Sequence, residues 1–321
     1  MTEVVCIGET MGQFVPAESG FRSATSFLLN HAGAESNTAI ALTRLGFDVE
    51  WVSRLGIDVI GDRILDSLRS EGVGVSGVSR DAGLHTGIFL KDPSQSDRQV
   101  TYYRTNSAAS QISLLDIDRA LDMRPRLIHL TGITPALSIS CDQAVTYAIE
   151  QCQRRGILSS FDVNYRPQLW SNQPLAARRL AELASASDIV FIGQDEANEL
   201  WGARVPADIT AVIGDTATLI VKDGARQAVS ISANQMVAVP ALRVRVIESV
   251  GAGDSFAAGW LAGLLRGYPP AMCLRLGHLA ARQALESITD QGEAASFEFI
   301  LDEAQKEPNW ANHNTADEEH H

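Results

Sequence analysis

Short apolar runs that end in glycine or polar residues recur along the chain, and amphipathic segments with helical spacing lie between them. The runs have the length of buried strands. They cover residues 4–7, 127–130, 158–161, 189–192 and 219–221. The helical segments include 36–45, 61–70, 142–155 and 175–186. This alternation predicts an α/β fold with a doubly wound, mainly parallel sheet and helices on both faces, whose ligands collect at the carboxyl ends of the strands.

One region interrupts the alternation. Two strand-like runs in the segment 84–106 flank a polar turn and have no helix between them. With the runs at 11–14 and 21–28, in the segment near 11–28, they predict a small antiparallel β sheet that projects from the main body and serves as a lid. Because exposed strand edges invite pairing with another chain, we expect a homo-oligomer formed through this lid.

The apolar pattern weakens after residue 286. Residues 1–306 are expected to form one domain, and the polar tail 307–321, which has no periodicity, is expected to be disordered. His320 and His321 at the end of the tail resemble the remnant of an affinity tag, so no functional argument rests on them.

The composition is that of an ordinary globular protein with ample material for a core, since 45% of the 321 residues are hydrophobic. The formal net charge of −13 argues against binding to nucleic acid or to an anionic membrane, because both require basic surfaces. No apolar run approaches the ~20 residues of a membrane span, and the first residues lead directly into a strand, so a cytoplasmic protein is expected. Any anionic substrate must then be met by local cations.

The four cysteines have neither metal-ligand nor CxxC spacing. They are Cys6, Cys141, Cys152 and Cys273. Because each lies in an apolar context, we interpret all four as reduced structural residues.

The strongest candidate for chemistry is a turn of small residues that ends in a carboxylate. Gly251, Ala252 and Gly253 let backbone N–H groups approach a ligand closely, and the helix expected over 255–265 points its positive end to the same place, so an anion is expected there. Asp254 would repel that anion unless it accepts a proton from the attacking group, which suggests phosphoryl transfer to a hydroxyl. The alternative is that Asp254 only caps the helix.

Two further polar clusters are candidates for binding. Gly33 lies in a turn before a helix, and Asn37 lies one helical turn further on, where its amide suits sugar hydroxyls; an incidental polar residue at a helix start is the alternative. Tyr102 and Arg104 alternate with Tyr103 and so share one face of a lid strand. There they either bind a carboxylate or face solvent.

A third cluster continues directly from a strand end. Asp162, Asn164 and Arg166 follow the run 158–161, at the edge where ligands of parallel sheets collect. Polar clusters at such positions cost stability unless they are used, so a functional role is favoured here.

Taken together, these stretches resemble the ribokinase-like (PfkB) family of carbohydrate kinases from about residue 4 to residue 293. The run 33–39 is similar to the N-terminal signature of that family, and 250–259 is similar to its C-terminal G-A-G-D signature. Tyr102-Tyr103-Arg104, followed by Ser107-Ala108-Ala109, and the stretch 162–170 are similar to the 2-keto-3-deoxygluconate kinase branch.

The resemblance implies a role for the carboxylate at the turn. Asp254 would be the base that accepts the proton of the attacking hydroxyl, while the amides of Gly251, Ala252 and Gly253 would hold the charge on the transferred phosphoryl group. ATP and Mg²⁺ would be the cofactors. The residues implied to bind the nucleotide are Asn164, Arg166, Lys222, Gly224, Gly251 and Gly253.

The resemblance also implies a sugar site. Its residues would be Gly33, Asn37, Tyr102, Arg104, Arg166 and Asp254. Tyr102, Arg104 and Arg166 would hold the carboxylate side of the sugar.

The chain departs from the family pattern at its ion sites. The N-x-x-E element that organises magnesium through water appears as Gly193-Gln194-Asp195-Glu196, so only Glu196 is retained for a metal. The usual Asp-Thr before the turn is Glu248-Ser249-Val250, which leaves a monovalent-cation site undecided. Glu293 is the nearest match to a Gly-Asp that reaches the substrate in the family.

We therefore expect an ATP-dependent kinase that phosphorylates a primary hydroxyl of a sugar acid, with 2-keto-3-deoxygluconate as the expected substrate. A fructokinase, or another kinase of a neutral sugar, is the alternative within the family. A catalytically silent sugar-binding regulatory protein is the alternative from another class.

Overall fold

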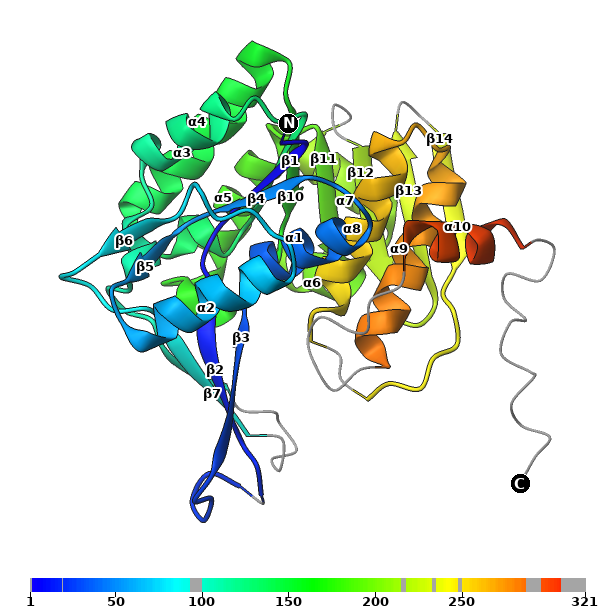
Figure 1. The fold of residues 1–321 in the computed structure, drawn as a ribbon. Coiled ribbons are helices and arrows are strands. Elements are labelled where there is room, and N and C mark those ends of the chain that lie inside the picture. The colour runs from blue at the N-terminus through cyan, green and yellow to red at the C-terminus, as the bar shows by residue number, and fades with distance from the viewer. Residues whose placement is uncertain are drawn as a thin grey trace, which may run out of the picture.

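A computed structural model describes residues 2–18, 20–92, 100–214, 218–232, 235–247, 250–286 and 296–306. Its centre is an eight-stranded sheet with the strand order β14-β13-β12-β11-β10-β9-β1-β4 (Figure 1). The parallel strands are β1 (Val4–Ile7), β4 (Val49–Val52), β9 (Leu127–Thr131), β10 (Leu158–Asp162), β11 (Ile189–Gly193) and β12 (Thr218–Asp223). β13 (Gln227–Ser232) and β14 (Gln235–Pro240) extend the sheet in antiparallel fashion. The predicted mainly parallel sheet is confirmed.

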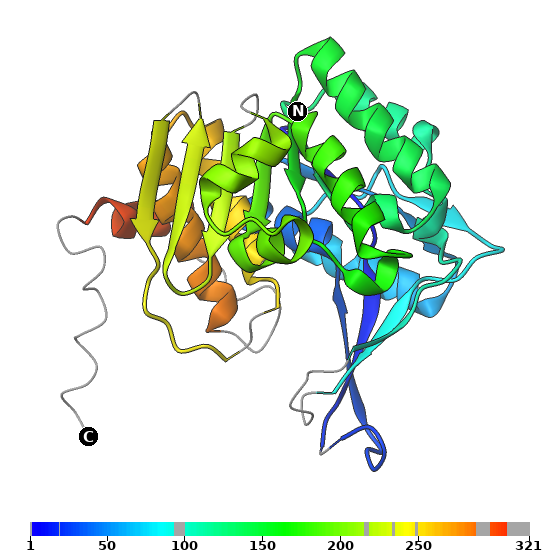
Figure 2. The ribbon, with the colours of Figure 1, turned by 180° about the vertical axis from the view of Figure 1, so that it is seen from behind.

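Helices cover both faces of this sheet, as Figures 1 and 2 show. One face packs against α1 (Ala34–Arg44), α2 (Val59–Ser70), α8 (Ala252–Leu265), α9 (Pro270–Leu285) and α10 (Phe297–Gln305). The other packs against α3 (Leu114–Asp122), α4 (Ile139–Arg155), α5 (Gln173–Ser185), α6 (Gln194–Trp201) and α7 (Pro206–Ile213). Two hydrophobic cores result, one on each side of the sheet.

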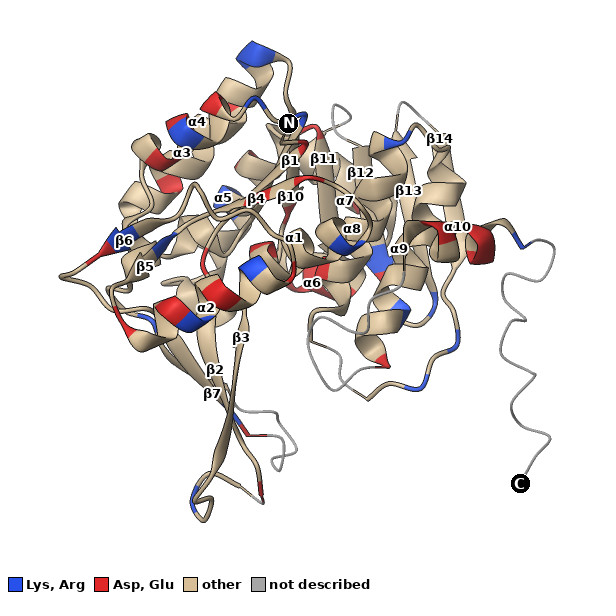
Figure 3. Cartoon of the chain, viewed as in Figure 1, with Lys and Arg blue, Asp and Glu red and all other residues tan. Residues whose placement is uncertain are grey.

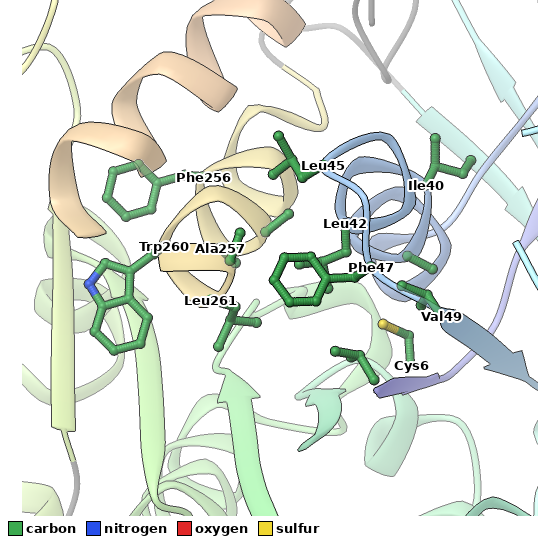
Figure 4. Close-up of a cluster of buried hydrophobic side chains, with 14 of the residues drawn as sticks. Cys6, Ile40, Leu42, Leu45, Phe47, Val49, Phe256, Ala257, Trp260 and Leu261 are labelled. Carbon is green, nitrogen blue, oxygen red and sulfur yellow. The ribbon is translucent and has the colours of Figure 1, made fainter. Parts of the chain in front are cut away.

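Alternation along the strands divides their side chains between the two cores. Val4 and Cys6 of β1 belong to the core on the α1 and α8 side, whereas Val5 and Ile7 belong to the other. Figure 4 shows the first core, in which side chains from α1 and α8 meet above the sheet. All four cysteines are free and buried, which agrees with the structural role that we predicted for them.

The predicted lid is a four-stranded sheet with the order β3-β2-β7-β8, and it projects from the body (Figure 1). Its strands are β2 (Met11–Pro16), β3 (Phe27–Ala32), β7 (Ile88–Lys91) and β8 (Val100–Tyr103). The pairs β2–β3 and β7–β8 are antiparallel as expected. The central pair β2–β7 is parallel, because both of these strands leave the body in the same direction.

The lid strand β3 lies later in the chain than predicted. We expected the strand that pairs with β2 near residues 21–28, but this strand, β3, covers Phe27–Ala32. Its position is set by the register with β2, which pairs Pro16 with Phe27 and Met11 with Ala32. The residues just before Phe27 belong to the connection at the tip of the lid. The polar turn of the second hairpin lies between Asp92 and Val100, outside the described residues, as does the tail 307–321.

Two short strands, β5 (Arg54–Gly56) and β6 (Ser79–Asp81), form a separate parallel pair beside α2. Figure 3 shows acidic and basic residues interspersed along α2 and α4, with no stripe of a single sign on these two helices. No helix within the described ranges is long and apolar enough to cross a bilayer.

Candidate active site

A cavity of about 600 Å³ lies where the carboxyl ends of the central strands meet the lid. Residues from β10, β11 and β12 and Glu9 after β1 line it on the body side, and residues from β2, β3, β7 and β8 line it on the lid side. The predicted site residues that line it are Gly33, Asn37, Tyr102, Arg104, Asn164, Arg166, Glu196, Lys222, Gly251, Gly253 and Asp254. The tertiary structure thus brings these residues, from six separate segments, around one cavity.

A second cavity of about 580 Å³ adjoins the first, and the two share Lys222 and Gly253. It contains the two remaining predicted residues, Gly224 and Ala252. Its walls are mostly apolar, with Phe256 and residues of α9 among them. An elongated ligand with a polar middle and an apolar end would fit across both cavities.

The turn at Gly251 starts α8, which begins at Ala252, three residues earlier than predicted. Gly251 is the N-cap residue and has a φ of 82°, in the left-handed region where glycine carries no steric cost. The alternative that Asp254 only caps this helix is wrong. The Asp254 carboxylate instead accepts a hydrogen bond of 2.8 Å from the Asn37 side-chain amide, 217 residues away on α1.

Asp254 is 9% exposed, and its charge is incompletely compensated. Burial, together with the negative charge of Asp162, raises the pKa of Asp254 to about 7. The hydrogen bond from Asn37 and the positive charges of Lys222 and Arg166 act in the opposite direction. A carboxylate with this pKa can accept a proton near neutral pH, as a general base must.

Lys222 stands at the end of β12 beside the glycine turn. Its Nζ donates a hydrogen bond of 2.8 Å to Oδ2 of Asp162, at the end of β10. Burial lowers the pKa of Lys222, but the charges of Asp162, Glu196 and Asp254 outweigh it and leave the pKa above its ordinary value. Lys222 is therefore a fixed cation at the place where an anion is expected.

Glu196, in the first turn of α6, accepts hydrogen bonds from the backbone N–H groups of Gly193 and Tyr165. Burial and the nearby charge of Asp162 raise its pKa. Among the residues that the structure describes, no group of three His, Cys, Asp or Glu side chains forms a ready metal site. Glu196 as a metal residue stays a prediction.

Within the part of the chain that the structure describes, two buried side-chain oxygens of residues that line the cavity have no hydrogen-bond partner. They are Oδ1 of Asn37 and Oδ1 of Asn164. Asn164 also has a φ of 41°, which is uncommon for a residue other than glycine. Buried acceptors without a partner are costly, and strained backbone tends to cluster at functional sites, so both features indicate a ligand that supplies donors or a cation here.

Gly33 is required by the close approach of two backbone segments. A Cβ atom on this residue would lie 2.3 Å from the Glu9 carbonyl oxygen and 2.8 Å from Oγ1 of Thr10. This contact sets α1 against the end of β1 and places Asn37 opposite Asp254. The helix start at 33–39 is therefore part of the site rather than an incidental one.

The lid side of the cavity confirms the predicted alternation and adds a partner that we did not predict. Tyr102 and Arg104 line the cavity, while Tyr103 is 55% exposed on the outer face. Arg104 is buried and paired with Glu9, its Nε donating a hydrogen bond of 2.7 Å to Glu9 Oε2. Arg166, in contrast, is exposed and donates to the Tyr165 carbonyl oxygen at 3.0 Å.

Sequence reasoning thus missed two residues of this region, Glu9 and the role of Asp162 as the partner of Lys222. Asp162 is the last residue of the buried strand β10, and Glu9 comes two residues after the end of the buried strand β1. The rule that strand-end polar residues face the ligand could have found them. The segment 248–249 and Glu293 lie outside the described residues, so the monovalent-cation site stays undecided and the structure does not test the match of Glu293.

A helix N-terminus facing a cavity, a fixed lysine and a buried carboxylate poised to accept a proton define a phosphotransferase that acts on a hydroxyl of a small molecule. The sequence matches the pfkB family of carbohydrate kinases over residues 1–295. The chain belongs to this family.

Comparisons with individual proteins agree. The chain is 36% identical over 271 residues to the 2-dehydro-3-deoxygluconokinase of Bacillus subtilis (strain 168), covering 83% of this chain and 84% of that protein. It is 32% identical over 301 residues to the 2-dehydro-3-deoxygluconokinase of Thermoproteus tenax, covering 92% and 91%. The crystal structure of a PfkB protein from Polaromonas sp. JS666 superposes with a TM-score of 0.83 at 33% identity, covering 90% of this chain and 97% of that one.

Proposed function

We propose that this carbohydrate kinase transfers the γ-phosphoryl group of ATP to a primary hydroxyl of a sugar acid, 2-keto-3-deoxygluconate. The observation that carries the proposal is the cavity itself, which is lined both by the buried carboxylate of Asp254 from the body and by Tyr102 and Arg104 at and after the lid strand β8. The names of the two curated relatives support the same substrate, which is the keto acid also called 2-dehydro-3-deoxygluconate.

The reaction follows from the geometry of the turn. Asp254, with its pKa raised to about 7, accepts the proton of the attacking hydroxyl. Asn37, which donates to Asp254 Oδ2, keeps the carboxylate in place. The N–H groups at the start of α8 and the Lys222 ammonium group stabilise the negative charge on the transferred phosphoryl group.

The nucleotide spans the shared part of the two cavities in this proposal. Its phosphates lie near Gly253 and Lys222, and its base occupies the mostly apolar second cavity beyond Gly224. The backbone at Gly224 has a φ of 52°, so a side chain there would be strained.

Mg²⁺ fits the same region, because its preferred ligands are oxygens of carboxylates and amides and water. Asn164 offers a buried Oδ1 without a partner, and the carboxylates of Asp162 and Glu196 lie close by. When bound, the ion would neutralise charge on the nucleotide phosphates. A monovalent cation is a further expectation, which rests on the segment next to Gly251.

The acid end of the sugar meets Tyr102 and two arginines. Arg166 is exposed at the cavity, and among the described residues its side chain donates a hydrogen bond to a backbone carbonyl, that of Tyr165, and to no carboxylate. It is therefore available to pair with a carboxylate. Arg104 offers the N–H groups that do not face Glu9.

A neutral ketose such as fructose is the second candidate substrate, and one observation favours it. The charge of Arg104 is already balanced by Glu9, so an arginine at this place does not by itself require an anionic substrate. A hydroxyl group could accept a hydrogen bond from the same guanidinium group.

A phosphorylation screen tests the proposal. The purified protein is incubated with ATP, Mg²⁺ and either 2-keto-3-deoxygluconate, gluconate, fructose, ribose or a nucleoside, and release of ADP is measured. We expect the highest kcat/KM with 2-keto-3-deoxygluconate. A higher kcat/KM with fructose would support the second candidate. The absence of sugar-dependent turnover with every compound would instead support a silent sugar-binding protein.

The lid supports a homo-oligomer, which we propose as the assembled state. Phe27 and Leu28 on its outer strand β3 are 42% and 56% exposed, and such apolar side chains on an open strand edge favour contact with a second copy. The cytoplasmic location and the lack of a nucleic-acid or membrane partner stay predictions from the sequence.

A further inference from the structure

Glu9 occupies an unusual position for a carboxylate, since it is buried in the wall of the cavity beside Arg104. The proposed function assigns this part of the cavity, around Tyr102 and Arg104, to the sugar, and we call it the sugar end. Its side chain is 1% exposed, and the residue follows Gly8, which comes directly after β1. Oε2 accepts hydrogen bonds from Nε of Arg104, at 2.7 Å, and from Nη2 of the same guanidinium group. Oε1 accepts a hydrogen bond of 2.5 Å from Oγ of Ser107. Both carboxylate oxygens are therefore occupied from within the protein.

The packing around the pair keeps it in one arrangement. Ser107 is fully buried, and its backbone N–H is bonded to the Arg104 carbonyl oxygen at 3.0 Å. A Cβ atom on Gly87 would lie 2.8 Å from Glu9 Oε1 and 3.5 Å from Arg104 Cβ, so the chain leading into β7 closes over the pair. Three segments thus fix the orientation of the guanidinium group.

This orientation leaves part of Arg104 available to a ligand. A guanidinium group has five N–H donors in a rigid plane. Two of them face Glu9. Arg104 also lines the cavity beside Tyr102, and its guanidinium carbon lies 5.6 Å from the centre of the Tyr102 ring. Arg104 can therefore donate hydrogen bonds to a sugar while its charge is balanced from behind.

The charge balance matters because one continuous cavity joins the two ends. Lys222 and Gly253, at the expected phosphate position, line the same cavity as Arg104. A polyphosphate carries several negative charges and would be drawn to an unpaired buried arginine more strongly than a sugar with one carboxylate. The ion pair with Glu9 weakens that attraction.

We propose that Glu9 is a specificity-determining positioning residue, which holds the Arg104 guanidinium group against the sugar site and cancels most of its charge. The sugar end then selects its ligand by hydrogen-bond geometry, and polyphosphates are left to the end marked by Lys222 and the glycine turn. The inference deepens the proposed function and rests on it for the identity of the sugar acid.

The test removes the negative charge of Glu9 and keeps the size and shape of its side chain. In Glu9→Gln, the amide oxygen still accepts from Arg104 Nε, and the amide nitrogen can donate to Ser107 Oγ. We expect the KM for 2-keto-3-deoxygluconate to fall roughly threefold to tenfold, the effect of one unit charge several ångströms away at a high effective permittivity, while the KM for fructose changes less. An unchanged ratio of the two KM values, or an equal rise in both, would overturn the proposal.

Inorganic tripolyphosphate provides a readout that a purely structural role would not change. In the wild-type enzyme it should compete with ATP and not with the sugar. In Glu9→Gln we expect it to compete with both, because Arg104 then carries an unbalanced charge. Competition with ATP alone in the variant contradicts the proposal. Tripolyphosphate binding measured by calorimetry, one site in the wild type and two in Glu9→Gln, needs no turnover and so separates failure of this inference from failure of the proposed function.

Two further variants complete the design. Ser107→Ala removes the hydrogen bond to Glu9 Oε1 without changing a charge, so the ratio of the two KM values should stay that of the wild type. A change in this ratio as large as that in Glu9→Gln would assign the effect to packing.

Arg104→Gln leaves the charge of Glu9 unbalanced. Adding Glu9→Gln to it should raise kcat/KM for the sugar acid by at least about threefold relative to Arg104→Gln, since a repulsive charge is removed. No recovery in the double variant would refute the proposal even if Glu9→Gln alone fails to fold.

Discussion

At one end of the cavity Asp254 accepts a hydrogen bond from the neutral amide of Asn37, and at the other end Arg104 is paired with the carboxylate of Glu9. Both charged groups are buried to nearly the same extent, 9% and 8% exposed. The difference lies in their partners. Among the described residues no cation is hydrogen-bonded to Asp254, and burial raises its pKa to about 7. Arg104, in contrast, forms an ion pair with Glu9.

This difference follows the task of each end. A group that must accept a proton needs a pKa near the working pH, and incomplete compensation of a buried charge supplies it. A group that only binds needs a fixed orientation, and a buried ion pair with additional hydrogen bonds supplies that. In the proposed function, the part of the cavity around Asp254, the transfer end, is thus suited to titration, and the part around Arg104 is suited to positioning the sugar.

The most severe test of this contrast is Asp254→Asn. We expect kcat to fall by about 10² to 10⁴, the usual contribution of a positioned base, because an amide cannot accept the proton of the hydroxyl. The KM for the sugar should change little, since asparagine can still accept the hydrogen bond from Asn37. Steady-state kinetics measures both constants.

Asp66→Asn on α2 serves as the control, because its side chain is 78% exposed and lies outside the cavity that contains Asp254. It should leave kcat unchanged. Wild-type turnover in Asp254→Asn would remove Asp254 from the mechanism and, with it, the contrast between the two ends.

The next largest effect is expected at Lys222. Replacement by methionine removes a charged hydrogen bond of about 1.5–3 kcal/mol, so kcat/KM for ATP should fall roughly tenfold to 150-fold, with a smaller change in the KM for the sugar. Arg226→Met is a matched control, since the side chain of this arginine is 72% exposed and forms an ion pair with Asp223, three residues earlier in the chain. Equal losses for ATP and for the sugar would show that Lys222 does not belong to the transfer end alone.

The smallest effect concerns pH. Because Asp254 must be unprotonated to act as a base, kcat/KM for the sugar should rise with pH and level off above a midpoint near 7. One pH unit below the midpoint, kcat/KM should be roughly a tenth of its plateau value. Replacing Asn37 by alanine removes the hydrogen bond that lowers this pKa, so the midpoint should move to higher pH. A profile that is flat from pH 5 to pH 8 would contradict the raised pKa.

The same pKa has a consequence for stability, with a defined sign. A folded-state pKa above the unfolded value means that the folded protein binds the proton more tightly, so the free energy of unfolding decreases as pH rises from about 4 through 7. Asp254→Asn has no carboxyl group at this position, so its free energy of unfolding should not show this decrease. Thermal unfolding should therefore show a larger stability gain for the variant at pH 8 than at pH 5; a gain that does not grow with pH would argue against the shift.

Local patterns predicted those parts of the molecule that depend on neighbours along the chain. The five strand-like runs are all strands of the central sheet, because an apolar run of that length ended by polar residues has few other places in an α/β fold. The turn at Gly251 was predictable because its glycines and the helix that follows are contiguous. The position of β3 was not, because the register between β2 and β3 decides it, and register depends on a partner strand.

The sequence by itself determined the fold class, the anion turn and the candidate base. The tertiary structure alone decided the partners of each charge, because these contacts join residues that are far apart along the chain. Asn37 and Asp254 are separated by 217 residues, Glu9 and Arg104 by 95, and Asp162 and Lys222 by 60. Periodicity describes which face a side chain occupies, but the pKa of a buried group depends on what lies within a few ångströms of it, and only the packed sheet, helices and lid determine that.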